Sequence, residues 1–281
     1  MRLSIITINR NNAVGLEKTM QSVAAQTCKE FEYIVIDGAS TDGSVDVIKK
    51  YESQFAQLRW VSEPDAGIYN AMNKGIRMAT GDYIQILNSA DCLAAPDVTE
   101  RMLAALEKAD NPSILYGNMV KCFPDGRKIV DKCFAGQEIT ILGMFTGTLN
   151  HDPAYIRRDL FEKYGYYDES LKIVSDWKWY LQAIILGSEK PQYVDIDVTL
   201  FDMTGISETN KDLDKEERKK VLEQLFPKTV LTDYEKYAFP IGQIKRLQRH
   251  PWAYKLVWLL ERCSFKQEKV KRKKNKISQY E

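Results

Sequence analysis

The chain has 281 residues, of which 44% are hydrophobic, and its formal net charge at neutral pH is +1. This length and composition exclude a disordered protein and allow one large α/β domain with an appendage, or two small domains. A net charge so close to zero argues against nucleic acid as a partner.

Cysteine usage and the first apolar run bear on the compartment. None of the five cysteines forms a CxxC pair, which favours a reducing environment over a disulfide framework or a zinc site; they are Cys28, Cys92, Cys122, Cys133 and Cys263. The run over residues 3–8 is too short for the core of a signal peptide, and no run approaches a membrane span. We therefore expect a cytoplasmic protein.

The first ninety residues alternate apolar runs of strand length with segments of helical spacing. Strands that are apolar at nearly every position and separated by helices predict an α/β fold, with a mostly parallel sheet flanked by helices on both faces. The predicted strands are 3–8, 31–37, 58–62 and 82–87, and the predicted helices are 16–26, 45–51 and 66–79.

After Pro96 the pattern changes. Two strand-like runs are joined by a Pro-Asp-Gly turn, which predicts a hairpin, and residues 136–170 mix short helices with loops. Ser175 is the predicted cap of the helix that follows it. The remaining predicted elements are helices over 97–108 and 175–186, one or two strands over 192–203, and two separate helices over 211–226 and 243–265.

Polar side chains stand where each of the first four strands ends. Ligands of parallel sheets bind beyond the carboxyl ends of the strands, so a nucleotide and its metal would fit at this edge. The side chains in question are Thr7, Asn9, Asp37, Glu63 with Asp65, and Asn88 with Asp91.

The candidate acids and His151 also have plainer, structural interpretations. Asp37 and Asp65 can accept hydrogen bonds from a base or ribose, but either can equally cap the following helix. Asp91 can be a solvated turn residue, or it can complete a Mg²⁺ or Mn²⁺ shell with diphosphate oxygens and water. Asp176 lies in the first turn of a helix, where the dipole stabilises an acid, and His151 can be structural.

Five segments, in their order and spacing, resemble family 2 of the inverting glycosyltransferases, which have the GT-A fold. The resemblance covers about residues 1–200 and is closest to the bacterial branch that builds surface polysaccharides. The segments are "SIITINRNN", "IVIDGASTDGS", "EPDAGIYNAMNKGI", "GDYIQILNSADCL" and "IVSDWKWYL".

The resemblance implies a nucleotide-sugar donor, UDP- or GDP-linked, bound by residues 1–95. It implies a glycan or lipid-linked acceptor bound by residues 96–205, with residues 206–281 as a helical extension. It also implies a role for each of several residues: Thr7, Asn9, Asp37 and Asp65 at the nucleoside, Asp91 on the metal with Asn88 assisting, His151 near the donor and acceptor, and Asp176 as the catalytic base.

The chain departs from the family pattern in two places. Asn88 and Ala90 stand where many members carry the acids of a DxD motif, so the metal turn has one carboxylate. Met72 replaces the arginine of "ARNxG", and Lys74 is the predicted substitute for its charge at the diphosphate. The chain also lacks the "QxxRW" signature of processive synthases, so we expect transfer of one sugar per encounter.

Two other functions are compatible with such a sheet. A sugar nucleotidyltransferase would need a Gly-rich loop after the first strand, which "INRNNAVG" does not supply. A non-catalytic protein that binds a sugar nucleotide or acts as a scaffold would be compatible with the reduced acidic motif.

The C-terminal sequence allows contact with a membrane surface, although a charged terminus is most often simply solvated. The aromatic and apolar helix precedes a basic tail from Lys266 onward, a combination suited to peripheral contact with the anionic inner face of a membrane. The same helix can instead pack on the domain.

Overall fold

The computed structural model describes residues 2–205, 210–248, 250, 252–253, 255–260 and 262. Two compact units divide the chain, Met1–Val221 and Leu222–Glu281. The predicted functional halves 1–95 and 96–205 fall within the first unit, and their boundary stays a prediction. Cys263 and the predicted basic tail lie outside the described residues.

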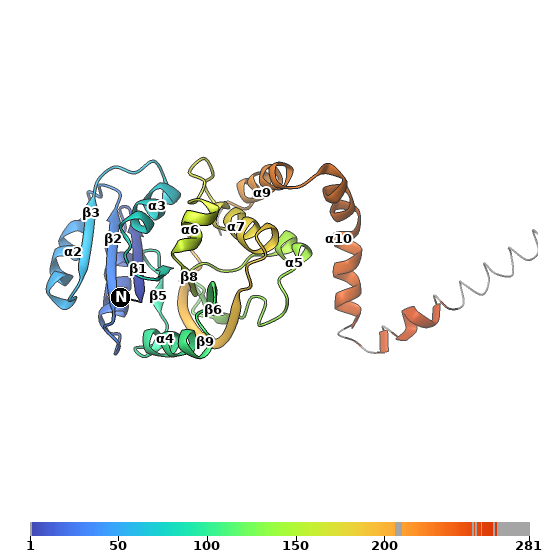
Figure 1. The fold of residues 1–281 in the computed structure, drawn as a ribbon, viewed down its shortest axis with the longest axis horizontal. Coiled ribbons are helices and arrows are strands. Elements are labelled where there is room, and N and C mark those ends of the chain that lie inside the picture. Colours follow the sequence, from blue (N-terminus) through green and yellow to red (C-terminus); the bar gives the residue numbers. More distant parts are fainter. Residues whose placement is uncertain are drawn as a thin grey trace, which may run out of the picture. The chain divides into compact units, whose positions relative to one another are not determined.

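A sheet of nine strands runs through the first unit in the order β3-β2-β1-β4-β8-β6-β9-β5, with β7 paired to β6 (Figure 1). The neighbouring strands β3, β2, β1 and β4 are parallel, as the sequence predicted. The strands are β1 (Leu3–Asn9), β2 (Phe31–Asp37), β3 (Leu58–Ser62), β4 (Tyr83–Ile86), β5 (Cys92–Leu93), β6 (Ile114–Cys122), β7 (Lys128–Asp131), β8 (Ala154–Arg157) and β9 (Gln192–Asp202).

The sheet becomes mixed beyond β4. Strand β8 lies antiparallel between β4 and β6, whereas β9 runs parallel to β6 and antiparallel to β5. The predicted hairpin is confirmed as β6 and β7. The sequence did not predict β8, because four residues after Pro153 carry no alternation that separates a buried strand from a loop.

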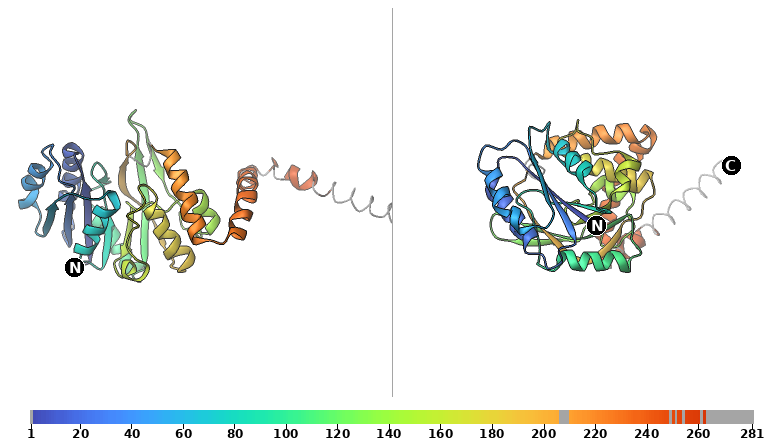
Figure 2. Two further views of the ribbon diagram at one scale, coloured as in Figure 1. Left: turned by 90° about the horizontal axis from the view of Figure 1, so that it is seen from above. Right: turned by 60° about the vertical axis from the view of Figure 1, so that its left-hand side comes forward.

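Helices cover both faces of the parallel strands, and the alternation of side chains along a strand decides which residues meet them. Leu3 and Ile5 of β1 share a core with α1 (Ala13–Ala24), α2 (Ser44–Tyr51) and α4 (Val98–Lys108). Ile6, on the other face, meets α3 (Ile68–Met78). Figures 1 and 2 show α3 and α4 on opposite sides of the strands.

A glycine sets the approach of α3 to the sheet. A Cβ on Gly75 would lie 2.4 Å from Ile6 Cγ2, so no larger residue fits without a shift of the helix. This close contact sets how near the second half of α3 lies to β1.

Shorter helices complete the first unit. Helix α7 (Ser175–Tyr180) continues into a π-helical turn, η2 (Leu181–Leu186). The others are η1 (Glu52–Gln54), α5 (Ile141–Thr146) and α6 (Asp159–Tyr164), and α9 (Lys211–Leu225) crosses the boundary between the units.

The prediction that Ser175 caps α7 is wrong. The N-cap position is Val174, and the buried Ser175 hydroxyl has no hydrogen-bond partner among the described residues. A carboxylate from α9 instead holds the segment that leads into α7. Glu217 accepts hydrogen bonds from the backbone N–H groups of Lys172, Ile173 and Val174 at 2.7, 2.9 and 3.3 Å.

The second unit also differs from its prediction. Helix α10 extends over Lys228–Gln248, so it starts well before the predicted helix at residue 243. Its first turn is closed by the Pro227 carbonyl, which accepts the N–H groups of Val230 and Leu231. Within the described part of the chain, no helix combines the length and the apolar character that crossing a bilayer requires.

Candidate functional site

Asp37, at the end of β2, lies fully buried beside the end of β1. Its carboxylate accepts hydrogen bonds from the Asn9 amide, from the Ser40 hydroxyl and N–H, and from the Ser62 hydroxyl, at 2.6 to 2.9 Å. Burial would raise the pKa of Asp37, but these hydrogen bonds outweigh it and lower the pKa below its ordinary value.

These four donors change the interpretation of Asp37. The sequence suggested that Asp37 is free to accept hydrogen bonds from a base or ribose. A carboxylate has about four acceptor positions, and all four are occupied here unless a serine hydroxyl turns away. The Asn9 Oδ1 atom is buried and has no partner among the described residues. It is the acceptor that this corner offers to an incoming N–H group.

The other predicted nucleoside residues lie at different depths. Thr7 is fully buried and its hydroxyl accepts a hydrogen bond from Tyr33, so it supports the sheet below the edge. Asp65 stands against Gly38, where an added Cβ would lie 2.2 Å from its Oδ2 atom. The structure therefore brings Asn9, Asp37 and Asp65 together and leaves Thr7 beneath them.

Lys74 does not point to a free anion site. Its ammonium group forms an ion pair with Glu63 at 2.8 Å and donates to the Pro64 carbonyl at 2.9 Å. The predicted contact with a diphosphate would require Lys74 to leave Glu63.

The turn after β4 is held in an unusual conformation. Ala90 has φ +86°, a left-handed value that costs a residue with a Cβ about 1–3 kcal/mol. The Thr19 hydroxyl fixes the turn by donating to the Asp91 carbonyl at 2.7 Å and accepting from the Ala90 N–H. Asp91 is 4% exposed, and its Oδ1 atom accepts the N–H of Asp202 at the end of β9.

Asp176 meets side chains from two other parts of the chain. Its Oδ1 atom accepts from the Tyr69 hydroxyl of α3 at 3.0 Å, and its Oδ2 atom lies 3.1 Å from His151 Nδ1. Burial would raise the pKa of Asp176, but the hydrogen bond and charge of His151, with Tyr69, lower it. The carboxylate is therefore ionised at neutral pH.

His151 joins Asp176 to the turn after β4. Its Nε2 atom lies 3.3 Å from the Asn88 amide and 3.4 Å from Asp152 Oδ1. Burial would lower the pKa of His151, but the charges of Asp152 and Asp176 and the hydrogen bond to Asp176 raise it to about 9. The imidazole is therefore a cation among carboxyl groups at neutral pH.

Asp152 belongs to the same cluster, although the sequence analysis did not single it out. It is 1% exposed and its carboxyl group is hydrogen-bonded to that of Asp91. Burial and the neighbouring carboxyl raise the pKa of Asp91 well above its ordinary range. The only sequence signal was an acid adjacent to His151 in "NHDPAY".

The residues around Asp91 fit a hard divalent cation that a diphosphate completes. Asp91 offers a carboxyl group and Asn88 an amide oxygen that has no hydrogen-bond partner among the described residues. Mg²⁺ sites often consist of one or two carboxylates together with phosphate oxygens. Among the described residues, no three His, Cys, Asp or Glu side chains are arranged to hold a metal alone.

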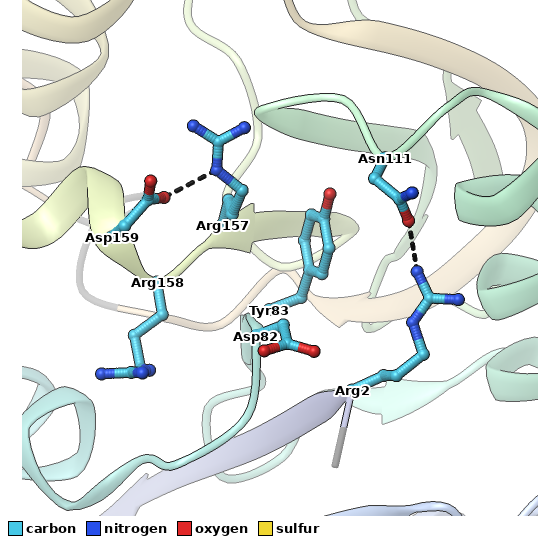
Figure 3. Close-up of a pocket in the computed structure, with 7 residues that line it drawn as sticks. All are labelled: Arg2, Asp82, Tyr83, Asn111, Arg157, Arg158 and Asp159. Atoms are coloured by element: carbon cyan, nitrogen blue, oxygen red, sulfur yellow. Dashed lines mark hydrogen bonds and ion pairs between the residues drawn. The ribbon is translucent and has the colours of Figure 1, made fainter.

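A hollow of about 440 Å³ lies away from this cluster, at the starts of β1 and β4 (Figure 3). Its arginines already have partners: Arg2 contacts Glu107 and Asn111, Arg157 contacts Asp159, and Arg158 donates to the Gly81 carbonyl. The hollow is therefore not the site that the strand ends form.

Comparison with known proteins matches this geometry to a family. Residues 4–165 match the profile described as "Glycosyl transferase family 2". An uncharacterized glycosyltransferase of Mycobacterium tuberculosis is 34% identical over 208 residues, 73% of this chain and 76% of the relative. A PGL/p-HBAD biosynthesis glycosyltransferase of Mycobacterium bovis is 26% identical over 73% of this chain and 79% of its own.

Solved structures share the fold. A fragment of S. aureus TarS (1–349) in complex with UDP superposes with a TM-score of 0.61 at 20% identity, over 72% of this chain and 60% of that chain. The matched region of this chain covers 37% of a longer TarS chain. A mannosyltransferase of Pyrobaculum calidifontis in complex with GDP-Man and Mn²⁺ has a TM-score of 0.60 at 16% identity, over 90% of this chain and 72% of that chain.

The predicted GT-A fold is confirmed by these likenesses, and the profile match covers more than half of the chain. With the relatives at 34% and 26% identity, it settles the family. The chain belongs to glycosyltransferase family 2.

Proposed function

We propose that the chain transfers one sugar, with inversion, from a UDP- or GDP-linked donor to a hydroxyl of a glycan or lipid-linked acceptor in bacterial surface polysaccharide synthesis. The observation that carries the proposal is the gathering of Asp91, His151 and Asp176 beyond the ends of β1 and β4. Family membership favours glycosyl transfer over nucleotidyl transfer.

The donor would lie along the carboxyl edge of the sheet. Asn9 and Asp37 supply buried polar groups for the nucleoside, and the free Asn9 Oδ1 atom suits an N–H of the base. Two structures with this fold are complexes with UDP and with GDP-Man, and we extend those nucleotides to this chain as a proposal.

Asp91 and Asn88 would hold Mg²⁺ or Mn²⁺ against the diphosphate. A divalent cation there offsets the negative charge of the leaving group. The chain's own part is to keep the Asp91 carboxyl group in a dry, fixed turn, through Thr19 and the N–H of Asp202.

Asp176 would accept the proton of the acceptor hydroxyl. An inverting displacement needs one base and no covalent intermediate, and a carboxylate that is ionised at neutral pH can serve as that base. Tyr69 and His151 each occupy one oxygen of Asp176, which leaves further lone pairs for the hydroxyl.

An assay of Asp176→Asn tests the proposal. With a panel of UDP- and GDP-sugars, we expect the transfer rate to fall by about 100- to 10,000-fold, while donor affinity and melting temperature change little. Asp159→Asn, on the distant hollow, is the matched control and should transfer normally.

Two results would contradict the proposal. Near-normal transfer by Asp176→Asn would remove this residue from the mechanism. A wild-type chain that binds nucleotide sugars but transfers none to any acceptor would be a non-catalytic binding protein.

A further inference from the structure

Asp152 and Asp91 come from opposite sides of the candidate metal turn. Asp91 ends the turn after β4, whereas Asp152 lies in the loop that enters β8. The Gln85 side chain of β4 donates to the Asp152 carbonyl at 2.9 Å, which fixes that loop against the strand. The antiparallel pairing of β4 and β8 thus brings two buried carboxyl groups into contact.

One oxygen of this pair accepts no hydrogen bond. Asp152 is 1% exposed, and its Oδ1 atom has no hydrogen-bond donor among the described residues. It forms an ion pair with His151 Nε2, at 3.4 Å. Buried polar atoms are nearly always hydrogen-bonded, so this carboxyl oxygen is a candidate ligand for a cation in the cluster.

The cluster is rich in carboxyl oxygens. The carboxyl groups of Asp152 and Asp176 both lie within 3.4 Å of the His151 imidazole, and that of Asp91 contacts Asp152. Carboxyl oxygens are the ligands that hard divalent cations prefer.

We propose that Asp152 supplies the second carboxylate ligand of a divalent cation at Asp91. The loop before β8 would thus provide the acid that the turn over residues 88–91 lacks. The inference rests on the proposed function, because the diphosphate of the donor completes the cation's shell. It explains how a chain with Asn88 and Ala90 in place of acids can still offer two charged oxygens.

A structural carboxyl pair is the competing explanation, and it behaves differently. Asn at position 152 can still hydrogen-bond to the Asp91 carboxylate, so a purely structural pair would tolerate Asp152→Asn. A metal ligand would not tolerate it, because the amide lacks the charge that the cation requires.

Mn²⁺ binding, measured by electron paramagnetic resonance of the free ion with UDP or GDP present, decides between them. We expect Asp152→Asn to weaken Mn²⁺ binding at least about tenfold, with nucleotide affinity in EDTA unchanged. Asp91→Asn should weaken it at least as much. The control Asp195→Asn, whose side chain is 63% exposed on β9, should bind Mn²⁺ like the wild type.

The outcomes separate this inference from the proposed function. Wild-type Mn²⁺ affinity in Asp152→Asn, with loss in Asp91→Asn, overturns the role of Asp152 and leaves sugar transfer intact. If the wild type binds no Mn²⁺ with either nucleotide, the role of Asp152 is also overturned. Sugar transfer by the wild type in EDTA then decides whether the proposed function still holds. If Asp152→Asn does not fold, Asp152→Ala replaces it, and unchanged Mn²⁺ affinity in that variant overturns the inference.

Discussion

The hydrogen bonds that Asp37 accepts determine both its pKa and its contribution to stability. Its pKa is lowered because donors from Asn9, Ser40 and Ser62 outweigh the effect of burial. An acid whose pKa is lower in the folded than in the unfolded chain stabilises the fold at every pH above the pKa that it has in the unfolded chain. That stabilisation is lost as the pH falls through the folded pKa.

We therefore expect Asp37→Asn to cost about 2 kcal/mol of unfolding free energy at pH 7, because hydrogen bonds to a charged group are replaced by weaker ones. The cost should shrink below about pH 4, where the carboxyl group of the unfolded chain begins to take up its proton, and it should go on shrinking as the pH falls through the lower pKa of the folded chain. Urea unfolding of both proteins from pH 7 to pH 3.5 measures the difference.

Ser62→Ala is the partial control, since it removes one of the four donors and should show a smaller effect with the same sign. A constant difference between wild type and Asp37→Asn at all pH values would contradict the cause given for the lowered pKa.

Two of the acids found by sequence analysis could be placed from the pattern of strands. Asp37 ends an apolar run and Asp91 lies in the turn that follows one, so their place at the carboxyl edge follows from the strand pattern alone. Asp152 and Glu217 have no such local signal. Asp152 reaches the site through the pairing of β4 with β8, and Glu217 through a helix about forty residues after α7.

At the scale of elements, α7 is positioned by a distant helix and not by its own first residue. Glu217 is 7% exposed and accepts three backbone N–H groups just before α7. Ser175 is a common cap by residue type, but its buried hydroxyl has no hydrogen-bond partner among the described residues, and Glu217 binds N–H groups that precede the helix.

Glu217→Gln should destabilise the fold by about 1–3 kcal/mol, because a charged acceptor of three hydrogen bonds becomes a neutral one. It should also lower the transfer rate more than donor affinity, because the start of α7 carries Asp176. Thermal unfolding and steady-state kinetics measure the two effects.

Glu216→Gln is the matched control, since Glu216 is the exposed neighbour on the same helix. Equal stability and kinetics in the two variants would show that the three N–H groups do not depend on the charge of Glu217.

At the scale of the whole molecule, the second unit presents a set of exposed apolar side chains. The most exposed is Trp252, at 73%, and the others are Leu256, Val257, Trp258, Leu259 and Leu260. An apolar helix near basic residues suits the surface of an anionic membrane, where a lipid-linked acceptor would also lie. The role of this surface stays a prediction.

The full chain should bind vesicles that contain anionic phosphatidylglycerol more strongly than a chain from which residues 248–281 are deleted. Raising the salt from 0.05 to about 0.5 M should weaken the binding, because screening shortens the reach of the charges. Co-sedimentation with neutral and anionic vesicles provides the measurement. Equal partitioning of the two chains would contradict membrane contact.

The bond between the Asp202 N–H and the Asp91 carboxylate has a consequence for synthesis on the ribosome. It joins positions 111 residues apart, because β5 pairs with β9. Translation at about 5–20 residues per second makes the second partner roughly 5–20 seconds after the first. Strands β1 to β4 have therefore all been synthesised while the Asp91 carboxylate still lacks its hydrogen bond to the Asp202 N–H. A nascent chain can form the hydrogen bonds around Asp37 first, and the turn at Asp91 closes only when β9 has emerged.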